Sequence, residues 1–275
     1  MSMLRRHYDD LPEAARLAVE DHTGQVKTSR TAAGGINSGI AAVLDTESGN
    51  VFVKGIPADH PQAVSQAREI AVSPFLPAAC PRLLWHVAVG GWVLLGYEVV
   101  AGQHADYMDS RDLVLVLDAL QELQRVTVPA DVDLKTAPQR WADYTLSTED
   151  AGLFAGETLL HTDFAADNVL IDGKRARIID WAWPTRGAAF IDPFVLAVRM
   201  MEAGQTAGDA VTWVSRLPAW REAPAKAVEA FAAATTHMWG DIAQADPQPW
   251  KTNMAQCASA MERFLRTRPW SVRRG

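Results

Sequence analysis

The sequence predicts an α+β fold of two lobes, and three observations lead to this prediction. The chain has 275 residues, more than one hydrophobic core usually organises. Over residues 1–101, short apolar runs alternate with polar and glycine-bearing turns, which is typical of strands joined by hairpins. After Gly102 the apolar residues recur at helical spacing instead. We therefore predict a β-rich N-terminal lobe with one key helix over residues 1–101 and a larger, mainly helical C-terminal lobe over residues 102–275.

The N-terminal lobe is predicted to contain two hairpins with a helix between them. The hairpins span residues 40–54 and 83–100, where apolar runs flank short turns. Asp59 as N-cap and Pro61 in the first turn predict a helix that ends near Pro74. This helix follows the second strand of the first hairpin.

The C-terminal lobe is predicted to open with a helix capped by Ser110, whose apolar positions continue to Leu123. Within an otherwise helical remainder, residues 169–180 form a short apolar strand, a glycine turn and a second strand. Several helices separated by prolines are expected over residues 193–275.

Composition excludes several classes of function. With 33 acidic and 26 basic residues, the net charge of −7 disfavours binding to nucleic acid or to anionic membranes. The two cysteines, Cys80 and Cys257, have neither disulfide-framework nor zinc-ligand spacing, which suits a reducing compartment. The N-terminus lacks an apolar signal segment, and no run approaches the length of a membrane span. We expect a cytoplasmic protein, and nothing in the sequence indicates an obligate protein partner.

Polar residues flank the hairpin of residues 169–180 at both ends. Asp163 and Asn168 precede it, and Asp180 ends it. A hairpin returns the chain to its starting point, so these side chains can converge, and carboxylate and amide oxygens suit Mg²⁺. Taken singly, each of them is more commonly a cap or turn residue.

The pattern His161-x-Asp163-x4-Asn168, followed by Asp180, resembles the catalytic loop and metal-binding Asp of protein-kinase-like phosphotransferases. The other elements of that family occur upstream in the required order, namely a glycine stretch with Gly34, Gly35 and Gly39, then Lys54 at a strand end, then Glu69 in the next helix. The resemblance extends from about Gly34 to Asp192 and implies a two-lobed protein-kinase-like fold.

The resemblance also implies a role for each residue. Lys54 would neutralise phosphate oxygens of a nucleotide, and Glu69 would hold Lys54 in place. Asp163 would be the catalytic residue, accepting a hydrogen bond from the attacking hydroxyl and aiming it. Asn168 and Asp180 would hold Mg²⁺ on the phosphates. The glycines would contact the nucleotide, although Gly34-Gly35-x3-Gly39 departs from the GxGxxG pattern.

Other residues near the motif receive structural roles. His161 is interpreted as a histidine that stabilises the loop, and Asp192 as the N-cap of the following helix, since Pro193 suits the first turn. Thr162 stands where protein kinases have Arg and where their antibiotic-kinase relatives frequently have Gly. Trp181 stands where protein kinases have Phe, and no Gly follows it. At these two positions the chain departs from the family pattern.

Two segment lengths indicate which branch of the superfamily the chain resembles. Only eleven residues separate Asp180 from Asp192, too few for the peptide platform of protein kinases. About sixty residues separate Gly102 from His161, an insertion similar to that of aminoglycoside and choline phosphotransferases. The resemblance to this aminoglycoside phosphotransferase-like group implies transfer of a γ-phosphoryl group to a hydroxyl of a small molecule, such as an antibiotic or related natural product.

The charge and aromatic content of the C-terminal region bear on the acceptor. Residues 193–275 contain seven acids and ten bases, which does not make the acidic bowl expected for a polycation. Seven of the ten tryptophans lie from Trp181 onward, and flat rings suit sugars or nucleobases, although most tryptophans belong to the core. Trp183 is the candidate for substrate contact. The acceptor could thus be an aminoglycoside, a nucleoside or a sugar-containing compound.

Residues 94–102 resemble the family's interlobe hinge. This alignment puts Tyr97 at the gatekeeper position and leaves the Glu98 carbonyl and the Val100 amide to contact the purine edge. The resemblance implies ATP or GTP as the phosphoryl donor, and with a bulky Tyr97 we expect GTP to be used at least as well as ATP. The alternative is that Tyr97 only packs inside the lobe with its hydroxyl satisfied.

Two other functions remain open from the sequence. A catalytically silent pseudokinase could bind nucleotide and act as an interaction module, although Lys54, Asp163, Asn168 and Asp180 are all retained. His161 and Asp163 could instead be ligands of a hydrolytic metal site. That reading lacks further His or Cys ligands at useful spacing.

Overall fold

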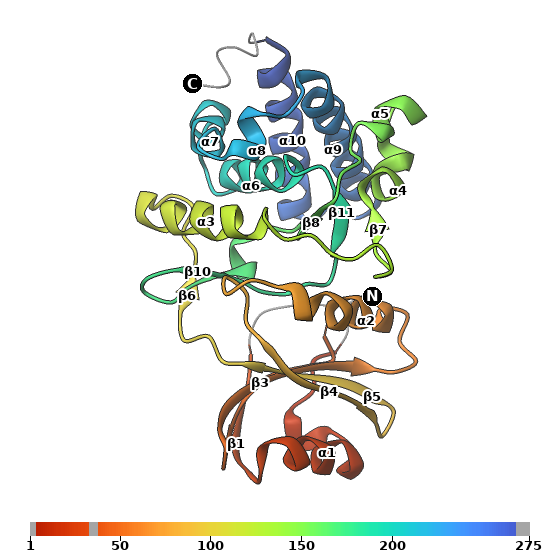
Figure 1. The fold of residues 1–275 in the computed structure, drawn as a ribbon, viewed down its shortest axis with the longest axis vertical. Coiled ribbons are helices and arrows are strands. Elements are labelled where there is room, and N and C mark those ends of the chain that lie inside the picture. The colour runs from red at the N-terminus through yellow and green to blue at the C-terminus, as the bar shows by residue number, and fades with distance from the viewer. Residues whose placement is uncertain (1–3, 33–37, 268–275) are drawn as a thin grey trace.

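The computed structural model describes residues 4–32 and 38–267. Figure 1 shows the part of the chain up to strand β5 (Trp92–Glu98) as a curved sheet with its helices at one end of the molecule, and a mostly helical body at the other end. The predicted two-lobed α+β fold is confirmed.

In the described part of the N-terminal lobe, five antiparallel strands form one sheet in the order β1-β2-β3-β5-β4. Their bounds are β1 (Val26–Thr31), β2 (Ile40–Thr46), β3 (Gly49–Pro57), β4 (Leu83–Val89) and β5 (Trp92–Glu98). Both predicted hairpins are present, because β2 pairs with β3 and β4 pairs with β5. Lys54 lies on the central strand, opposite Ala41 on one side and Leu95 on the other.

Helices lie on both faces of this sheet (Figure 1). Helix α1 (Glu13–Thr23), after the turn η1 (Tyr8–Asp10), packs Ala15 and Val19 into the apolar core of the sheet. Helix α2 (Ala63–Val72), followed by η2 (Ser73–Phe75), lies on the face toward the C-terminal lobe. The sequence analysis predicted α2 but missed α1 and β1. The predicted cap was also wrong, because the N-cap of α2 is Gln62 and not Asp59.

The C-terminal lobe opens with α3 (Ser110–Leu123), which buries an apolar stripe that includes Leu113, Leu117 and Leu120. Asp109, and not Ser110, is its N-cap, since the Asp109 carboxylate accepts from the Arg111 amide at 2.8 Å. The remaining helices are α4 (Ala137–Trp141), η3 (Ala142–Tyr144), α5 (Thr148–Gly152), η4 (Ala166–Asn168), α6 (Ile191–Glu202), α7 (Ala207–Val214), α8 (Pro218–Arg221), α9 (Ala225–Ala245) and α10 (Pro249–Thr267).

Short strands join this helical body to the hinge. The predicted hairpin is β9 (Val169–Ile171) with β10 (Ala176–Ile178), and β6 (Gln103–His104) pairs with β9. A second small sheet contains β7 (Lys135–Thr136), β11 (Thr185–Gly187) and β8 (Thr158–Leu160). Gly102, just before β6, packs closely against the end of β9. A Cβ atom added at this position would lie 2.4 Å from the Ile171 carbonyl oxygen. The hinge segment thus needs glycine where it meets β9.

In the described residues, no helix combines the length and apolarity needed to cross a membrane.

The large core of the C-terminal lobe buries aromatic residues of several segments against one another. Phe231 of α9 makes edge-to-face contacts with Trp141, Phe154, Phe190 and Phe194. This core supports α6, the helix that reaches the candidate site.

Candidate active site

Lys54, on strand β3, contacts a residue of each lobe. Its Nζ lies 2.6 Å from Oε2 of Glu69 on α2 and 2.9 Å from Oδ1 of Asp180, which follows β10. Lys54 and Glu69 are buried, and the side chain of Asp180 is about one-third exposed. A buried ammonium is stable here because two carboxylates compensate it.

The electrostatics of this cluster favour the charged forms of Lys54 and Asp180. Burial alone would lower the pKa of Lys54, but the charges of Asp180 and Glu69 outweigh burial and raise it. The charge of Lys54 is in turn the main cause that lowers the pKa of Asp180. Asp180 is therefore available as an anion, with Lys54 on Oδ1 and no described donor on Oδ2.

The hairpin β9–β10 brings the other polar residues to the same place. The Ile179 amide donates to the Asn168 carbonyl at 2.9 Å, so Asn168 lies beside the residue that precedes Asp180. The Asn168 side-chain amide donates to the Asp163 carbonyl at 3.2 Å. The structure thus brings Asp163, Asn168 and Asp180 together, as the hairpin argument required.

Helix α6 holds the loop that carries Asp163. Asp192 accepts from the backbone amides of His161 and Thr162 at 2.8 and 2.9 Å. The prediction that Asp192 is an N-cap is wrong, because α6 begins at Ile191 with Phe190 as its N-cap. The Asp192 carboxylate serves the neighbouring loop instead of its own helix.

This support is needed because the loop backbone is strained. Thr162 has a φ of 67° and Asp180 a φ of 63°, values in the left-handed region that side-chain-bearing residues seldom adopt. The Thr162 hydroxyl also donates to the Trp183 carbonyl at 3.0 Å. Thr162, which stands where protein kinases have Arg, therefore fastens the loop to the segment after Asp180.

Replacing Asp192 by Ala is expected to lower the free energy of unfolding by about 3 kcal/mol, because two buried amides would lose their acceptor beside a strained residue. Asp192→Asn keeps one acceptor oxygen and should cost less. Chemical denaturation of both variants measures the difference. An equal and small effect, below about 1 kcal/mol for both, would contradict this account of Asp192.

His161 is a structural residue in this arrangement. Its Nε2 bonds the Ile179 carbonyl at 2.9 Å, and its Nδ1 is 3.3 Å from the Asp163 amide. Phe164 and Trp181 pack against the buried ring edge-to-face. Both ring nitrogens are engaged, so the structure does not support His161 as a metal ligand of a hydrolytic site.

Arg199 on α6 was missed by the sequence analysis. Its Nη2 donates to Asp163 Oδ1 at 3.0 Å, and its Nη1 donates to Glu202 Oε2 at 2.7 Å. The available signal was its spacing, since Arg199 follows Asp192 by seven residues and so lies on the same helix face two turns later. Spacing alone did not say that this face meets the Asp163 loop.

The predicted hinge residues lie at the end of β5. The Tyr97 hydroxyl donates to Glu69 Oε1 at 2.7 Å, so it contacts the carboxylate that pairs with Lys54. Burial and the Glu69 charge raise the pKa of Tyr97 well above its ordinary value. The Glu98 carboxylate is ion-paired with Arg177 and Arg82, which leaves only its backbone for a ligand. Val100 follows the strand, at the entrance to the C-terminal lobe.

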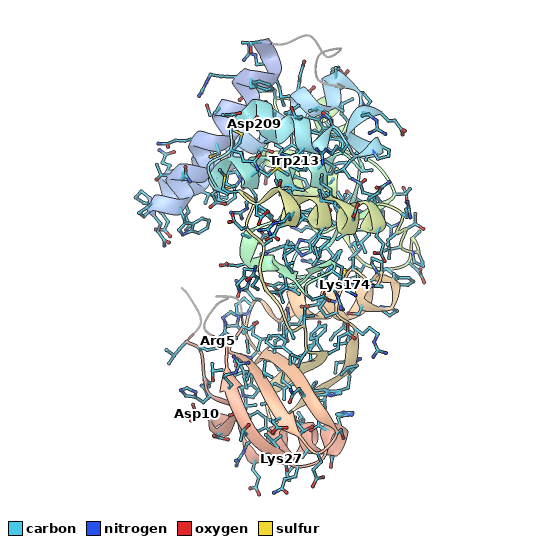
Figure 2. All side chains as sticks on the ribbon, turned by 90° about the vertical axis from the view of Figure 1, so that its left-hand side faces the viewer. Arg5, Asp10, Lys27, Lys174, Asp209 and Trp213 are labelled. Atoms are coloured by element: carbon cyan, nitrogen blue, oxygen red, sulfur yellow. The ribbon has the colours of Figure 1, made fainter. Side chains whose placement is uncertain are left out.

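Of the predicted glycines, Gly34 and Gly35 lie outside the described residues, whereas Gly39 directly precedes β2. The Gly39 carbonyl accepts from the Arg6 amide at 2.8 Å. Figure 2 shows the neighbouring Arg5 at the end of the sheet that faces the C-terminal lobe, and Lys27 at the opposite end. The N-terminal segment thus crosses the lobe beside the start of β2.

Trp183 lies three residues after Asp180, and its side chain is 43% exposed. With Arg68 and other residues of α2 it lines a pocket of about 90 Å³ between the lobes. Arg140 donates to the Trp183 carbonyl at 2.8 Å and places its guanidinium over the Trp183 ring. The ring is accessible next to the loop of Asp163.

Solved structures with the same arrangement of elements provide the comparison. No protein-family profile matches the chain, and no curated protein matches its sequence. A thermostable mutant of aminoglycoside phosphotransferase APH(4)-Ia, solved with ADP and hygromycin B, matches with a TM-score of 0.63 at 12% identity, covering 92% of this chain and 98% of that one. The chain has the aminoglycoside phosphotransferase fold.

Two further structures have the same fold. LicA in complex with AMP matches with a TM-score of 0.62 at 13% identity, over 91% of this chain and 97% of that one. A choline/ethanolamine kinase family protein from Mesorhizobium loti matches with a TM-score of 0.54 at 16% identity, over 94% and 98%. The aminoglycoside phosphotransferase fold therefore accounts for nearly the whole chain.

The residues at the centre of this fold suit Mg²⁺. The Asn168 amide nitrogen is used by the Asp163 carbonyl, which leaves the amide oxygen for a cation, and Asp180 keeps Oδ2. In the described part of the chain, no group of three or more His, Cys, Asp or Glu side chains could hold a metal ion alone. Mg²⁺ needs no such group, because substrate phosphates and water complete its coordination.

Proposed function

We propose that this protein is a Mg²⁺- and nucleotide-dependent phosphotransferase that moves the γ-phosphoryl group of ATP or GTP to a hydroxyl of a small molecule. The observation that carries the proposal is the contact of Lys54 with both Glu69 and Asp180, which joins residues of both lobes. Nucleotide-bound structures share the fold, with ADP in APH(4)-Ia and AMP in LicA. The proposed location is the cytoplasm, where both nucleotides are available.

On the donor side, each side chain has one task. Lys54 binds α- and β-phosphate oxygens, and Glu69 keeps the Lys54 ammonium in the cleft. Asn168 and Asp180 would hold Mg²⁺, which when bound neutralises charge on the phosphates. The backbone of Glu98 and Val100 would contact the purine, and the glycine stretch would cover the phosphates.

On the acceptor side, Asp163 orients the hydroxyl for attack on the γ-phosphorus. Its carboxylate accepts the hydroxyl hydrogen bond, which is a positioning role if the transition state is loose. A small acceptor is favoured because residues 185–187 form strand β11, paired with β8 and β7. The short segment between Asp180 and α6 is thus committed to a sheet and offers no extended platform for a peptide.

The test is a screen for acceptors. Hydroxylated antibiotics, nucleosides and sugars are incubated with the protein, Mg²⁺ and either ATP or GTP, and each is examined by mass spectrometry for the gain of one phosphate. A product formed by the unmodified protein and lost on omission of Mg²⁺ supports the proposal. Nucleotide binding without transfer or hydrolysis would favour the pseudokinase alternative.

Tyr97 gives a prediction about the donor. We expect GTP to be used at least as well as ATP, because a bulky Tyr97 at the aligned gatekeeper position would block the deeper adenine pose. We expect Tyr97→Ala to shift preference toward ATP. The measurement is kcat/KM for both nucleotides in both proteins.

Tyr97→Phe is the matched control for this experiment. It keeps the ring but removes the hydrogen bond to Glu69, so the ratio of GTP to ATP use should stay unchanged while overall activity falls modestly. A strong ATP preference in the unmodified protein that neither substitution alters would contradict the gatekeeper argument. It would leave Tyr97 as an interior residue that supports Glu69.

A further inference from the structure

Arg199 is bound to the proposed catalytic carboxylate and is itself held in place from several directions. Beyond its bonds to Asp163 and Glu202, Nη1 lies 3.4 Å from the sulfur of Met254 on α10. The guanidinium carbon is 5.7 Å from the ring centre of Trp239 on α9. Only 10% of the Arg199 side chain is exposed. The guanidinium is therefore fixed by its surroundings, and the Asp163 carboxylate takes the position that this guanidinium sets.

The contact determines which oxygen of Asp163 is presented to a substrate. Both donors that the described residues aim at this carboxylate, Arg199 Nη2 at 3.0 Å and the Ala165 amide at 3.4 Å, reach Oδ1. Oδ2 is left for an acceptor hydroxyl. Since Asp192 holds the loop backbone and Arg199 the side chain, one face of α6 orients Asp163 at two points.

The contact with Asp163 is part of a larger ion-paired cluster. The Arg199 guanidinium is compensated by two carboxylates, those of Asp163 and Glu202. Trp250 packs against Trp239 at 6.0 Å between ring centres and is 42% exposed. The surroundings of Arg199 thus combine an ion-paired guanidinium with aromatic faces.

We propose that Arg199 is a positioning residue for Asp163, whose guanidinium holds Oδ1 and so leaves Oδ2 to meet the acceptor hydroxyl. The proposal rests on the proposed phosphotransferase function.

The test compares Arg199→Met with Arg199→Lys. Loss of the positive charge in Arg199→Met should lower kcat about a hundredfold, because the carboxylate is no longer aimed. KM for Mg²⁺-ATP should change by less than about twofold, since Arg199 does not reach the donor. Arg199→Lys keeps one charged donor at this position, so its kcat should be about tenfold higher than that of Arg199→Met. Rates are measured with uridine, adenosine and methyl glucoside, and with water as acceptor.

Arg216→Met is the matched control. Arg216 also packs on a tryptophan, with its guanidinium 4.0 Å from the centre of the Trp213 ring, but it lies on the surface after α7. This variant should retain full activity. Thermal unfolding of all variants separates lost stability from lost orientation, because a merely structural Arg199 would lower the midpoint while the folded protein kept its kcat.

An active protein whose Arg199→Met variant keeps kcat overturns the inference. Absence of transfer and of nucleotide hydrolysis in both the unmodified protein and Arg216→Met would instead overturn the proposed function.

Discussion

Replacing Asp163 by Asn is expected to lower the rate of phosphoryl transfer by about a thousandfold while the affinity for Mg²⁺-nucleotide stays nearly unchanged. The amide retains the shape of the side chain but is a poorer acceptor for the hydroxyl hydrogen bond. It also weakens the contact with Arg199, which at present orients the carboxylate. Binding should survive, because Lys54, Asn168 and Asp180 on the donor side are untouched. Single-turnover kinetics and a nucleotide titration measure the two quantities separately.

Asp167→Asn is the matched control for this variant. Asp167 lies in the same loop, four residues later, and is exposed. The same chemical change should leave both rate and binding unaltered. Substantial residual transfer in Asp163→Asn, or an equal loss in Asp167→Asn, would remove Asp163 from its proposed catalytic role.

The parts of the site that could be predicted from sequence are those joined by short-range geometry. A hairpin of a dozen residues must return to its start, so the approach of Asn168 to Asp180 follows from local pairing between β9 and β10. Lys54 and Glu69 could be paired because a strand and the next helix provide them in the family order. The chemical roles of these residues, and the lobe boundary at residue 102, remain predictions.

Long-range packing is what the sequence did not reveal. Arg199 reaches Asp163 across 36 positions, and helical spacing gives its face without identifying the loop that this face meets. Asp192 was assigned to a cap by local rules, yet two loop amides outcompete its own helix for the carboxylate. In both cases tertiary contacts decide which of several plausible partners a polar side chain takes.

The missed elements of the N-terminal lobe have a different cause. Helix α1 could have been predicted from its apolar spacing, because Leu11, Ala15 and Val19 recur every four residues, and all three are buried. Strand β1 has almost no such pattern, since its sequence VKTSRT is mostly polar and the strand lies at the edge of the sheet. An edge strand buries little of its own surface, so its pattern gives almost no hydrophobic alternation to recognise.

The metal role of Asp180 leads to the second large effect. Asp180→Asn is expected to weaken binding of Mg²⁺-ATP at least about tenfold, because it removes the charged oxygen ligand. Asn is preferable to Ala here, since Asp180 has a φ of 63° and Asn tolerates that backbone conformation. Lys54 keeps Glu69 as a partner in this variant, which limits the disturbance of the phosphate site.

The decisive measurement is the dependence of affinity on Mg²⁺. Nucleotide binding is titrated with Mg²⁺ and again with a chelator, for the unmodified protein, Asp180→Asn and Asp172→Asn. Asp172 lies in the turn at the far end of the same hairpin, where it pairs with Arg177 at 3.7 Å, so its substitution should not alter Mg²⁺ dependence. In Asp180→Asn the affinities with and without Mg²⁺ should become similar, because the metal no longer links protein to phosphate. A variant that binds weakly yet retains the full Mg²⁺ dependence would show that Asp180 acts through Lys54 and not as a metal ligand.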